Sequence, residues 1–171
     1  MDNAVLLALI VSCAPQVDVG TARALIAVES GVNPFAIGVV GGVLEWQPTG
    51  RNEAIATARA LQAGGWNFSV GLAQINRRNF DRLGLSVEAA FDSCVNLAAM
   101  QTVLTECFER AAQPGGGVQR ALRQALSCYY SGNFSTGFTH GYVRRVVAAR
   151  ASQAPATPLT PAIPTPSKDS S

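Results

Sequence analysis

Apolar side chains recur every three to four positions along most of the chain, the spacing that places them on one face of a helix. Glycine and proline interrupt this pattern, for example at Pro15, at Asn33-Pro34 and at Gly64-Gly65. We expect Asn52 to cap one helix and Ser86 to begin a brief one. The pattern predicts helices over residues 3–14, 18–30, 51–63, 79–83, 94–112, 118–130 and 142–151.

A small β element is predicted between the second and third of these helices. The β-prone runs 37–40 and 43–46 flank Gly41-Gly42, which is a two-residue hairpin signal, and residues 66–72 supply a third short strand. Helices around a small β element with a cleft between them form a lysozyme-like arrangement. We therefore expect a mainly α (α+β, lysozyme-like) fold with a small β-hairpin insertion and a substrate cleft.

The chain divides into two parts by composition. Residues 1–150 carry the periodic pattern and are expected to form one domain. Residues 151–171 are expected to be an extended, disordered tail, because five of the nine prolines lie between Gln153 and Ser171.

Composition excludes several classes of protein. The 171 residues are 48% hydrophobic and 14% charged, against about 25% charged in a typical soluble domain, so the chain can bury a core. The net charge of +2 gives no electrostatic case for nucleic acid or a membrane surface. No apolar run approaches the roughly 20 residues that span a bilayer.

Four cysteines with wide spacing favour two disulfides and an oxidising compartment over a metal site, since no CxxC pair exists and His140 is the only histidine. Cys94 and Cys107 share one predicted helix and would lie roughly 20 Å apart, too far to bond. Two pairings remain: Cys13–Cys94 with Cys107–Cys128, or Cys13–Cys107 with Cys94–Cys128. Four buried free thiols are the alternative.

The N-terminal apolar run, residues 4–11, is interpreted as the first core helix rather than a signal peptide. The residues before it are Met-Asp-Asn, without the Lys or Arg of a signal's n-region. If the protein is exported, we expect its signal to be missing from this sequence or export to use another route.

Glu29 is the acid with the clearest chemical potential. It ends the apolar stripe Ala22, Leu25 and Ile26, where desolvation disfavours the charged carboxylate and raises its pKa. Such a carboxyl group can donate a proton near neutral pH. A solvent-facing glutamate at a helix end is the alternative.

Two polar segments could line a cleft for sugars. In residues 71–76, Gly71 permits close backbone approach, and Gln74 and Asn76 offer donors and acceptors for hydroxyl and acetamido groups. Tyr129 and Tyr130 end a later helix, and tyrosines can hydrogen-bond sugar oxygens. A polar turn and core packing are the respective alternatives.

Taken together, these segments are similar to a known family. The blocks ALIAVESGVNPFAIG, SVGLAQINRRNF, ALSCYYSGNF and GYVRRV occur in the order seen in soluble lytic transglycosylases, which are related to goose-type lysozyme. The resemblance covers roughly residues 10 to 150. It is closest to the first component of type IV secretion systems, proteins that cut peptidoglycan locally so that the apparatus can cross the wall.

The resemblance implies a role for individual residues. Glu29 matches the family's single catalytic acid/base, Gln74 a glutamine that contacts substrate, and Tyr129 a tyrosine near the catalytic carboxyl. Tyr130 stands where the family has Asn, and Ala73 where it has Met. A Gly-rich insertion, residues 38–42, replaces a short serine-containing loop. The substrate-binding set implied by these blocks is Gln74, Asn76, Tyr129, Tyr130, Gly71 and Tyr142.

The implied reaction is cleavage of the β-1,4 bond between N-acetylmuramic acid and N-acetylglucosamine, leaving a 1,6-anhydromuramoyl end. It implies a periplasmic monomer without cofactor or metal, whose partners are glycan strands and other secretion components. The proline-rich tail would be a linker, a docking segment or a plain disordered end. The alternatives are a lysozyme-type hydrolase with Glu45 or Glu53 as second carboxylate, or a wall-binding assembly factor without catalysis.

Overall fold

The computed structural model describes residues 1–153 and has the expected mainly helical architecture with a small sheet. The tail predicted for 151–171 lies, from residue 154 on, outside the described residues. The helices are α1 (Asn3–Cys13), α2 (Val19–Ser30), α3 (Arg51–Ala63), η1 (Arg77–Asn79), α4 (Phe80–Leu83), α5 (Val87–Ala90), α6 (Ser93–Ala111), α7 (Val118–Ser131), α8 (Thr136–Thr139) and α9 (Tyr142–Ser152).

The sheet has three short antiparallel strands, β1 (Ile37–Val39), β2 (Phe68–Val70) and β3 (Ile75–Asn76), in the order β1-β2-β3. The predicted hairpin of 37–40 with 43–46 is wrong, because β1 pairs with β2 instead. The side chain of Gln47 explains why: its Oε1 accepts from Ile37 N at 2.8 Å and its Nε2 donates to Ile37 O at 2.9 Å. These bonds occupy the edge of β1 at which 43–46 would have paired.

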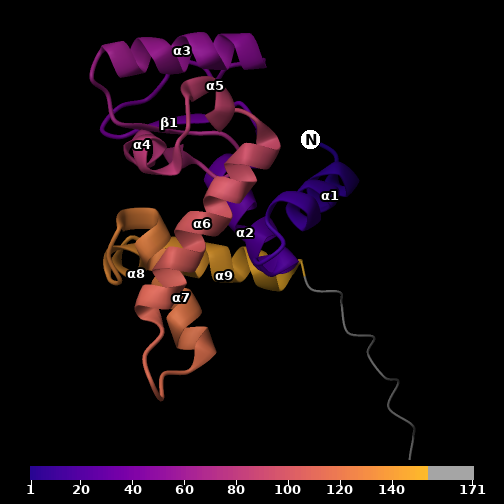
Figure 1. Ribbon diagram of the computed structural model, residues 1–171, viewed down its shortest axis with the longest axis vertical. Coiled ribbons are helices and arrows are strands. Elements are labelled where there is room, and N and C mark those ends of the chain that lie inside the picture. The colour runs from indigo at the N-terminus through magenta and orange to yellow at the C-terminus, as the bar shows by residue number, and fades with distance from the viewer. Residues whose placement is uncertain (154–171) are drawn as a thin grey trace, which may run out of the picture.

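The long helix α6 connects two groups of elements (Figure 1). The sheet lies with α3, α4 and α5 at one end, and α7, α8 and α9 lie at the other. Leu97 and Met100 of α6 and Leu25 and Ile26 of α2 are fully buried in the common core. The core therefore fixes the C-terminal end of α2 between the two groups.

The N-terminal segment forms a core helix, as expected. Leu6 and Ile10 of α1 are buried, and the side chain of Asp2 caps the helix by accepting from Ala4 N. The cap predicted for α3 is wrong: its N-cap is Gly50, not Asn52. Glu53 instead reaches back to Thr49, accepting from its N and Oγ1, and this fixes the chain one turn earlier.

Within residues 1–153, no helix has the length and apolar character needed to cross a membrane. The short elements β3 and α8 were not predicted from the sequence. Both are four residues or shorter, which is too short for a periodic pattern to register.

Two disulfides connect the helices, Cys13–Cys94 and Cys107–Cys128, and this is the first of the two pairings left open by the sequence. The first joins the end of α1 to the start of α6, and the second joins α6 to α7. Both ends of α6 are thus covalently tied to neighbouring helices.

Removing either disulfide should lower stability, and removing Cys13–Cys94 should lower it more. Its cysteines are 81 positions apart, against 21 for Cys107–Cys128, and cross-linking a longer loop restricts the unfolded chain more. The chain-entropy relation gives a loss of about 4 to 5 kcal/mol for the Cys13→Ala/Cys94→Ala variant and about 3 kcal/mol for Cys107→Ala/Cys128→Ala. Urea unfolding of both variants measures this; an equal or reversed ranking would contradict it.

Candidate active site

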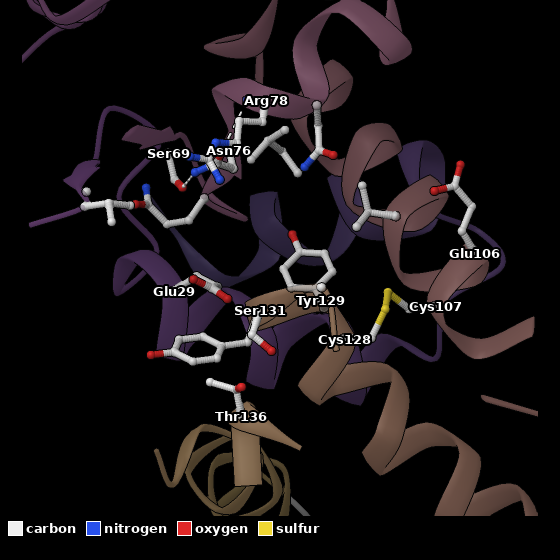
Figure 2. Close-up of a pocket in the computed structure, with 18 of the residues that line it drawn as sticks. Glu29, Ser69, Asn76, Arg78, Glu106, Cys107, Cys128, Tyr129, Ser131 and Thr136 are labelled. Atoms are coloured by element: carbon white, nitrogen blue, oxygen red, sulfur yellow. Dashed lines mark hydrogen bonds between the residues drawn. A yellow bond between two sulfur atoms is a disulfide. The ribbon is translucent and has the colours of Figure 1, made fainter. Parts of the chain in front are cut away.

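A cleft of about 1270 Å³ lies beside the sheet and receives side chains from both groups of elements. The sheet side contributes Ser69, Gln74 and Asn76, and the helical side contributes Tyr129 and Tyr130. Glu29 also lines the cleft, and Figure 2 shows it below Ser69 and Asn76 and to the left of Tyr129. The cleft thus brings together residues that are far apart in the sequence.

Glu29 lies in the last turn of α2. Two features fix this turn: the end of the helix at Gly31 and a hydrogen bond from Ser30. The helix ends at Gly31, whose left-handed φ of 59° reverses the chain. The hydroxyl of Ser30 donates to Leu72 O at 2.7 Å, which connects this turn to the segment after β2. These contacts hold the Glu29 carboxyl at the cleft.

Burial raises the pKa of Glu29 to about 7, because the surrounding protein disfavours the charged carboxylate. The Tyr142 hydroxyl, which donates to Glu29 Oε1 at 2.5 Å, and the nearby positive charge of Arg145 act in the opposite direction and lower the pKa. Among the described residues, no second carboxylate contributes to the shift in the pKa of Glu29. Glu29 is therefore protonated in an appreciable fraction of molecules near neutral pH.

Tyr142 lies behind Glu29 rather than on the cleft surface. It is 1% exposed and does not line the cleft, whereas Tyr130, stacked on it with ring centroids 4.6 Å apart, does. Burial and the charge of Glu29 raise the pKa of Tyr142 well above its usual value, so it stays a hydrogen-bond donor. The sequence predicted Tyr142 to bind substrate; in the structure its hydroxyl contacts Glu29 and its side chain does not line the cleft.

Gln74 adopts a left-handed backbone conformation, with φ of 49°, at the turn after β2. Its Nε2 donates to Ala36 O at 3.0 Å and to Gly71 O at 2.9 Å, and this fixes the amide at the cleft. A Cβ at Gly38 would lie 2.7 Å from Gln74 Oε1. The glycine in β1 therefore leaves the space in which the amide oxygen lies.

Asn96 is a site-supporting residue that the sequence reasoning missed. Its buried side chain donates to Val70 O and Ala90 O and accepts from Ala73 N at 2.9 Å. Gly71 does not line the cleft; a Cβ there would lie 2.3 Å from Asn96 Nδ2. The sequence could have indicated Asn96, because it lies at helical spacing from Met100 and Cys107 and so falls on the buried face of α6.

Tyr129 connects α7 to the same turn, since its hydroxyl donates to Ala73 O at 2.7 Å. Burial and the negative charge of Glu29 raise its pKa well above the usual value, which places the phenol near that carboxyl. Figure 2 shows the Tyr129 ring between Glu29 and the Cys107–Cys128 disulfide. The disulfide thus anchors the residue next to Tyr129.

Of the other candidate residues, some line the cleft and some do not. Asn76 lines the cleft and donates from Nδ2 to Ser69 Oγ at 3.2 Å. Glu45 and Glu53 do not line it. Glu106 does, but it bonds Arg82 and lies beyond the disulfide from Glu29 in Figure 2. Within residues 1–153, no three His, Cys, Asp or Glu residues group as a metal site requires.

A mainly helical fold around a small sheet, with a half-buried acid facing a cleft, defines a lysozyme-like protein. The chain belongs to the Transglycosylase SLT domain family, which it matches over residues 7–149.

Named relatives agree with this family. The chain is 50% identical over 143 residues to the type IV secretion system protein virB1 of Brucella abortus (strain 2308), covering 80% of this chain and 60% of that protein. It is 39% identical over 150 residues to protein virB1 of Rhizobium radiobacter, covering 84% of this chain and 60% of that protein. The chain thus spans about 60% of the length of these relatives. No solved structure matches it significantly.

The raised pKa of Glu29 should make stability fall as pH rises. From about 4.5, the usual value, to about 7, the unfolded state loses this proton more readily than the folded state. Above that window the ionised, buried carboxylate should cost about 3 kcal/mol, a cost that Glu29→Gln avoids. Urea unfolding of the parent and of Glu29→Gln from pH 4 to 8.5 measures this. Below pH 4.5 the stabilities of the two proteins should change with pH in the same way. Above pH 7 the variant should be more stable relative to the parent than it is at low pH.

Glu45→Gln is the matched control, because it removes a carboxylate from an exposed position outside the cleft. Measured in the same way, it shows what the loss of a carboxylate outside the cleft does to stability. A parent–Glu29→Gln difference that does not change between pH 4 and 8.5 would contradict the raised pKa of Glu29.

Removing the hydroxyl of Tyr142 should raise the pKa of Glu29 further, because that hydrogen bond stabilises the carboxylate. Carbon-13 NMR titration of the Glu29 carboxyl in Tyr142→Phe measures the change. Tyr130→Phe is the control, since it keeps the Tyr142–Glu29 bond and should leave the titration midpoint in place. A midpoint that is unchanged or lower in Tyr142→Phe would show that the tyrosine does not act on Glu29.

Proposed function

We propose that this protein is a peptidoglycan lytic transglycosylase that cleaves the β-1,4 bond between N-acetylmuramic acid and N-acetylglucosamine. The single observation that carries the proposal is the Glu29 carboxyl, which faces the cleft with a pKa of about 7 and a hydrogen bond from Tyr142. A group with this pKa can donate and accept a proton at the same pH. Membership of the SLT family supports the same reaction class.

In the proposed reaction, protonated Glu29 donates to the glycosidic oxygen as the C1–O bond breaks. The acetamido group of the substrate stabilises the positive charge at C1, as in substrate-assisted glycosidases. Glu29, now ionised, takes the proton from the C6 hydroxyl, whose oxygen bonds to C1. The product is a 1,6-anhydromuramoyl end, no water is consumed, and one carboxyl serves both steps.

The neighbouring polar groups would hold the sugar rings during this reaction. The amide of Gln74 and the side chain of Asn76 line the sheet side of the cleft, and Tyr129 and Tyr130 line the opposite side. Tyr142 is proposed as a positioning residue, because it contacts Glu29 and is too buried to contact substrate.

The biological setting is proposed from the relatives. Proteins 50% and 39% identical to this chain are named virB1, the former as a type IV secretion system protein. We propose that this chain acts as a monomer in the periplasm, opening the wall locally for assembly of such a system and contacting its other components. Its two disulfides support an oxidising compartment.

A lysozyme-type hydrolase is the second candidate. It would need another carboxylate to place a water molecule opposite Glu29. The positions of Glu45 and Glu53 outside the cleft weigh against it. A wall-binding assembly factor would need the cleft but not the acid.

Peptidoglycan digested with the parent should yield muropeptides lighter by one water than their reducing counterparts, as measured by mass spectrometry. Glu29→Gln should reduce the yield by a factor of at least about 1,000, because both proton transfers are lost. Glu45→Gln and Glu53→Gln, the matched controls, should digest at the parent rate.

Each alternative has its own outcome in the same experiment. Reducing ends in place of anhydro ends, with loss of activity in Glu45→Gln or Glu53→Gln, would establish the hydrolase. If the parent and Glu29→Gln bind peptidoglycan equally well and neither releases soluble product, the wall-binding assembly factor would be established.

A further inference from the structure

Three ring side chains meet on the helical side of the cleft. Tyr130 and Tyr142 are stacked, with ring centroids 4.6 Å apart and an angle of 19° between their planes. His140 lies edge-on to Tyr130, and its Nδ1 is hydrogen-bonded to the Tyr130 hydroxyl at 3.3 Å. The stacked rings differ in exposure, because Tyr130 is 42% exposed and Tyr142 is 1% exposed. Tyr130 therefore lies on the solvent side of the stack.

The main chain connects the three helices that carry these rings. α7 is joined to α8 through Ser127, whose Oγ accepts from Gly137 N at 3.0 Å. α9 begins directly after His140, because Gly141 adopts a left-handed φ of 70°. His140 O accepts from Arg145 Nη1 at 3.1 Å, which ties the end of α8 to α9. The three rings thus lie at a corner whose elements are bonded to one another.

The covered ring of the stack is the hydrogen-bond partner of Glu29. The other described groups that act electrostatically on this carboxyl are Arg145 on α9 and Tyr129 on α7. Burial is the largest influence, and it raises the pKa of Glu29 to about 7 although Tyr142 and Arg145 lower it. Water that reached the Tyr142–Glu29 bond would solvate the carboxylate and remove part of the effect of burial. The side chain that covers Tyr142 therefore bears on the proton affinity of Glu29.

We propose that Tyr130 is a positioning residue whose ring covers Tyr142 and keeps water away from the Tyr142–Glu29 hydrogen bond. The inference rests on the proposed function and deepens it, because a desolvated acid is needed only if Glu29 donates a proton. The ring supplies the cover, and the bond of its hydroxyl to His140 fixes its orientation. This role is separate from any contact with sugar that the same side chain makes at the cleft.

The first test titrates the Glu29 carboxyl by carbon-13 NMR in the protein without substrate. In Tyr130→Ala the midpoint should fall by about 1 pH unit from about 7, because water then stabilises the carboxylate. Tyr130→Ser removes the ring in a second way and should lower the midpoint equally. Tyr130→Phe keeps the stacked ring and should keep the parent midpoint.

Phe138→Ala is the matched control for the loss of a ring. Phe138 is 46% exposed on the neighbouring helix α8 and does not line the cleft, so its removal should leave the midpoint in place. A midpoint that stays near 7 in Tyr130→Ala and Tyr130→Ser would overturn the proposal. An equal fall in Tyr130→Phe or Phe138→Ala would also overturn it.

The second test compares kcat/KM of Tyr130→Ala and parent on soluble glycan strands at pH 5 and pH 7. A midpoint lowered by about 1 pH unit reduces the protonated fraction of Glu29 about fivefold at pH 7 and hardly at pH 5. The ratio of variant to parent kcat/KM should therefore be about fivefold higher at pH 5. If Tyr130 only bound sugar, the ratio would be the same at both pH values, and that result would overturn the cover.

The two tests distinguish failure of this proposal from failure of the proposed function. A lowered midpoint in Tyr130→Ala, in a protein whose parent form cleaves no peptidoglycan, would support the cover and refute the enzyme. Cleavage by the parent that Glu29→Gln abolishes, with an unmoved midpoint in Tyr130→Ala, would support the enzyme and refute the cover.

Discussion

The contact between the Glu29 carboxyl and the Tyr142 hydroxyl is the constraint around which the rest of the structure is arranged. A carboxyl group at the edge of an apolar core is unfavourable when ionised, and the tyrosine limits that cost without removing it. The packing of α2 against α9 holds the two groups together, and core residues such as Leu25 and Val146 hold those helices. The protonation behaviour of Glu29 therefore depends on how the core packs α2 against α9.

The remaining groups of the site depend on one short turn, residues 71–74. Ser30 of α2, Tyr129 of α7 and Asn96 of α6 all hydrogen-bond to the main chain of this turn. Side chains from three helices are thus aligned on the same few main-chain atoms. The Cys107–Cys128 disulfide supports this alignment by fixing α7 to α6 beside Tyr129.

The sequence predicted much of this fold because its helices carry long periodic patterns. The helix bounds were confirmed within one or two residues for α1, α2, α3, α6, α7 and α9. The predicted hairpin failed because a tertiary contact, Gln47 bonding to the edge of β1, outweighed the local turn signal of Gly41-Gly42.

The candidate site was predictable only in part. Glu29, Gln74 and Tyr129 stand in recognisable blocks, and all three were expected at one cleft. The position of Tyr142 behind Glu29, and the bonds of Asn96 to Val70 O and Ala73 N, depend on contacts across more than 20 residues. Periodicity indicates which face of a helix is buried, but it does not indicate which partner a buried polar group meets.

The hydrogen bonds at the 71–74 turn are made by main-chain atoms: Leu72 O and Ala73 O accept them, and Ala73 N donates one. Peptide groups are the same whatever residue carries them. Substitution at positions 72 and 73 is therefore limited by the volume available in the core rather than by bonding chemistry. Gly71 has no such freedom, because a side chain there meets Asn96. Homologous sequences can thus drift at two of these positions while the geometry of the cleft is inherited unchanged.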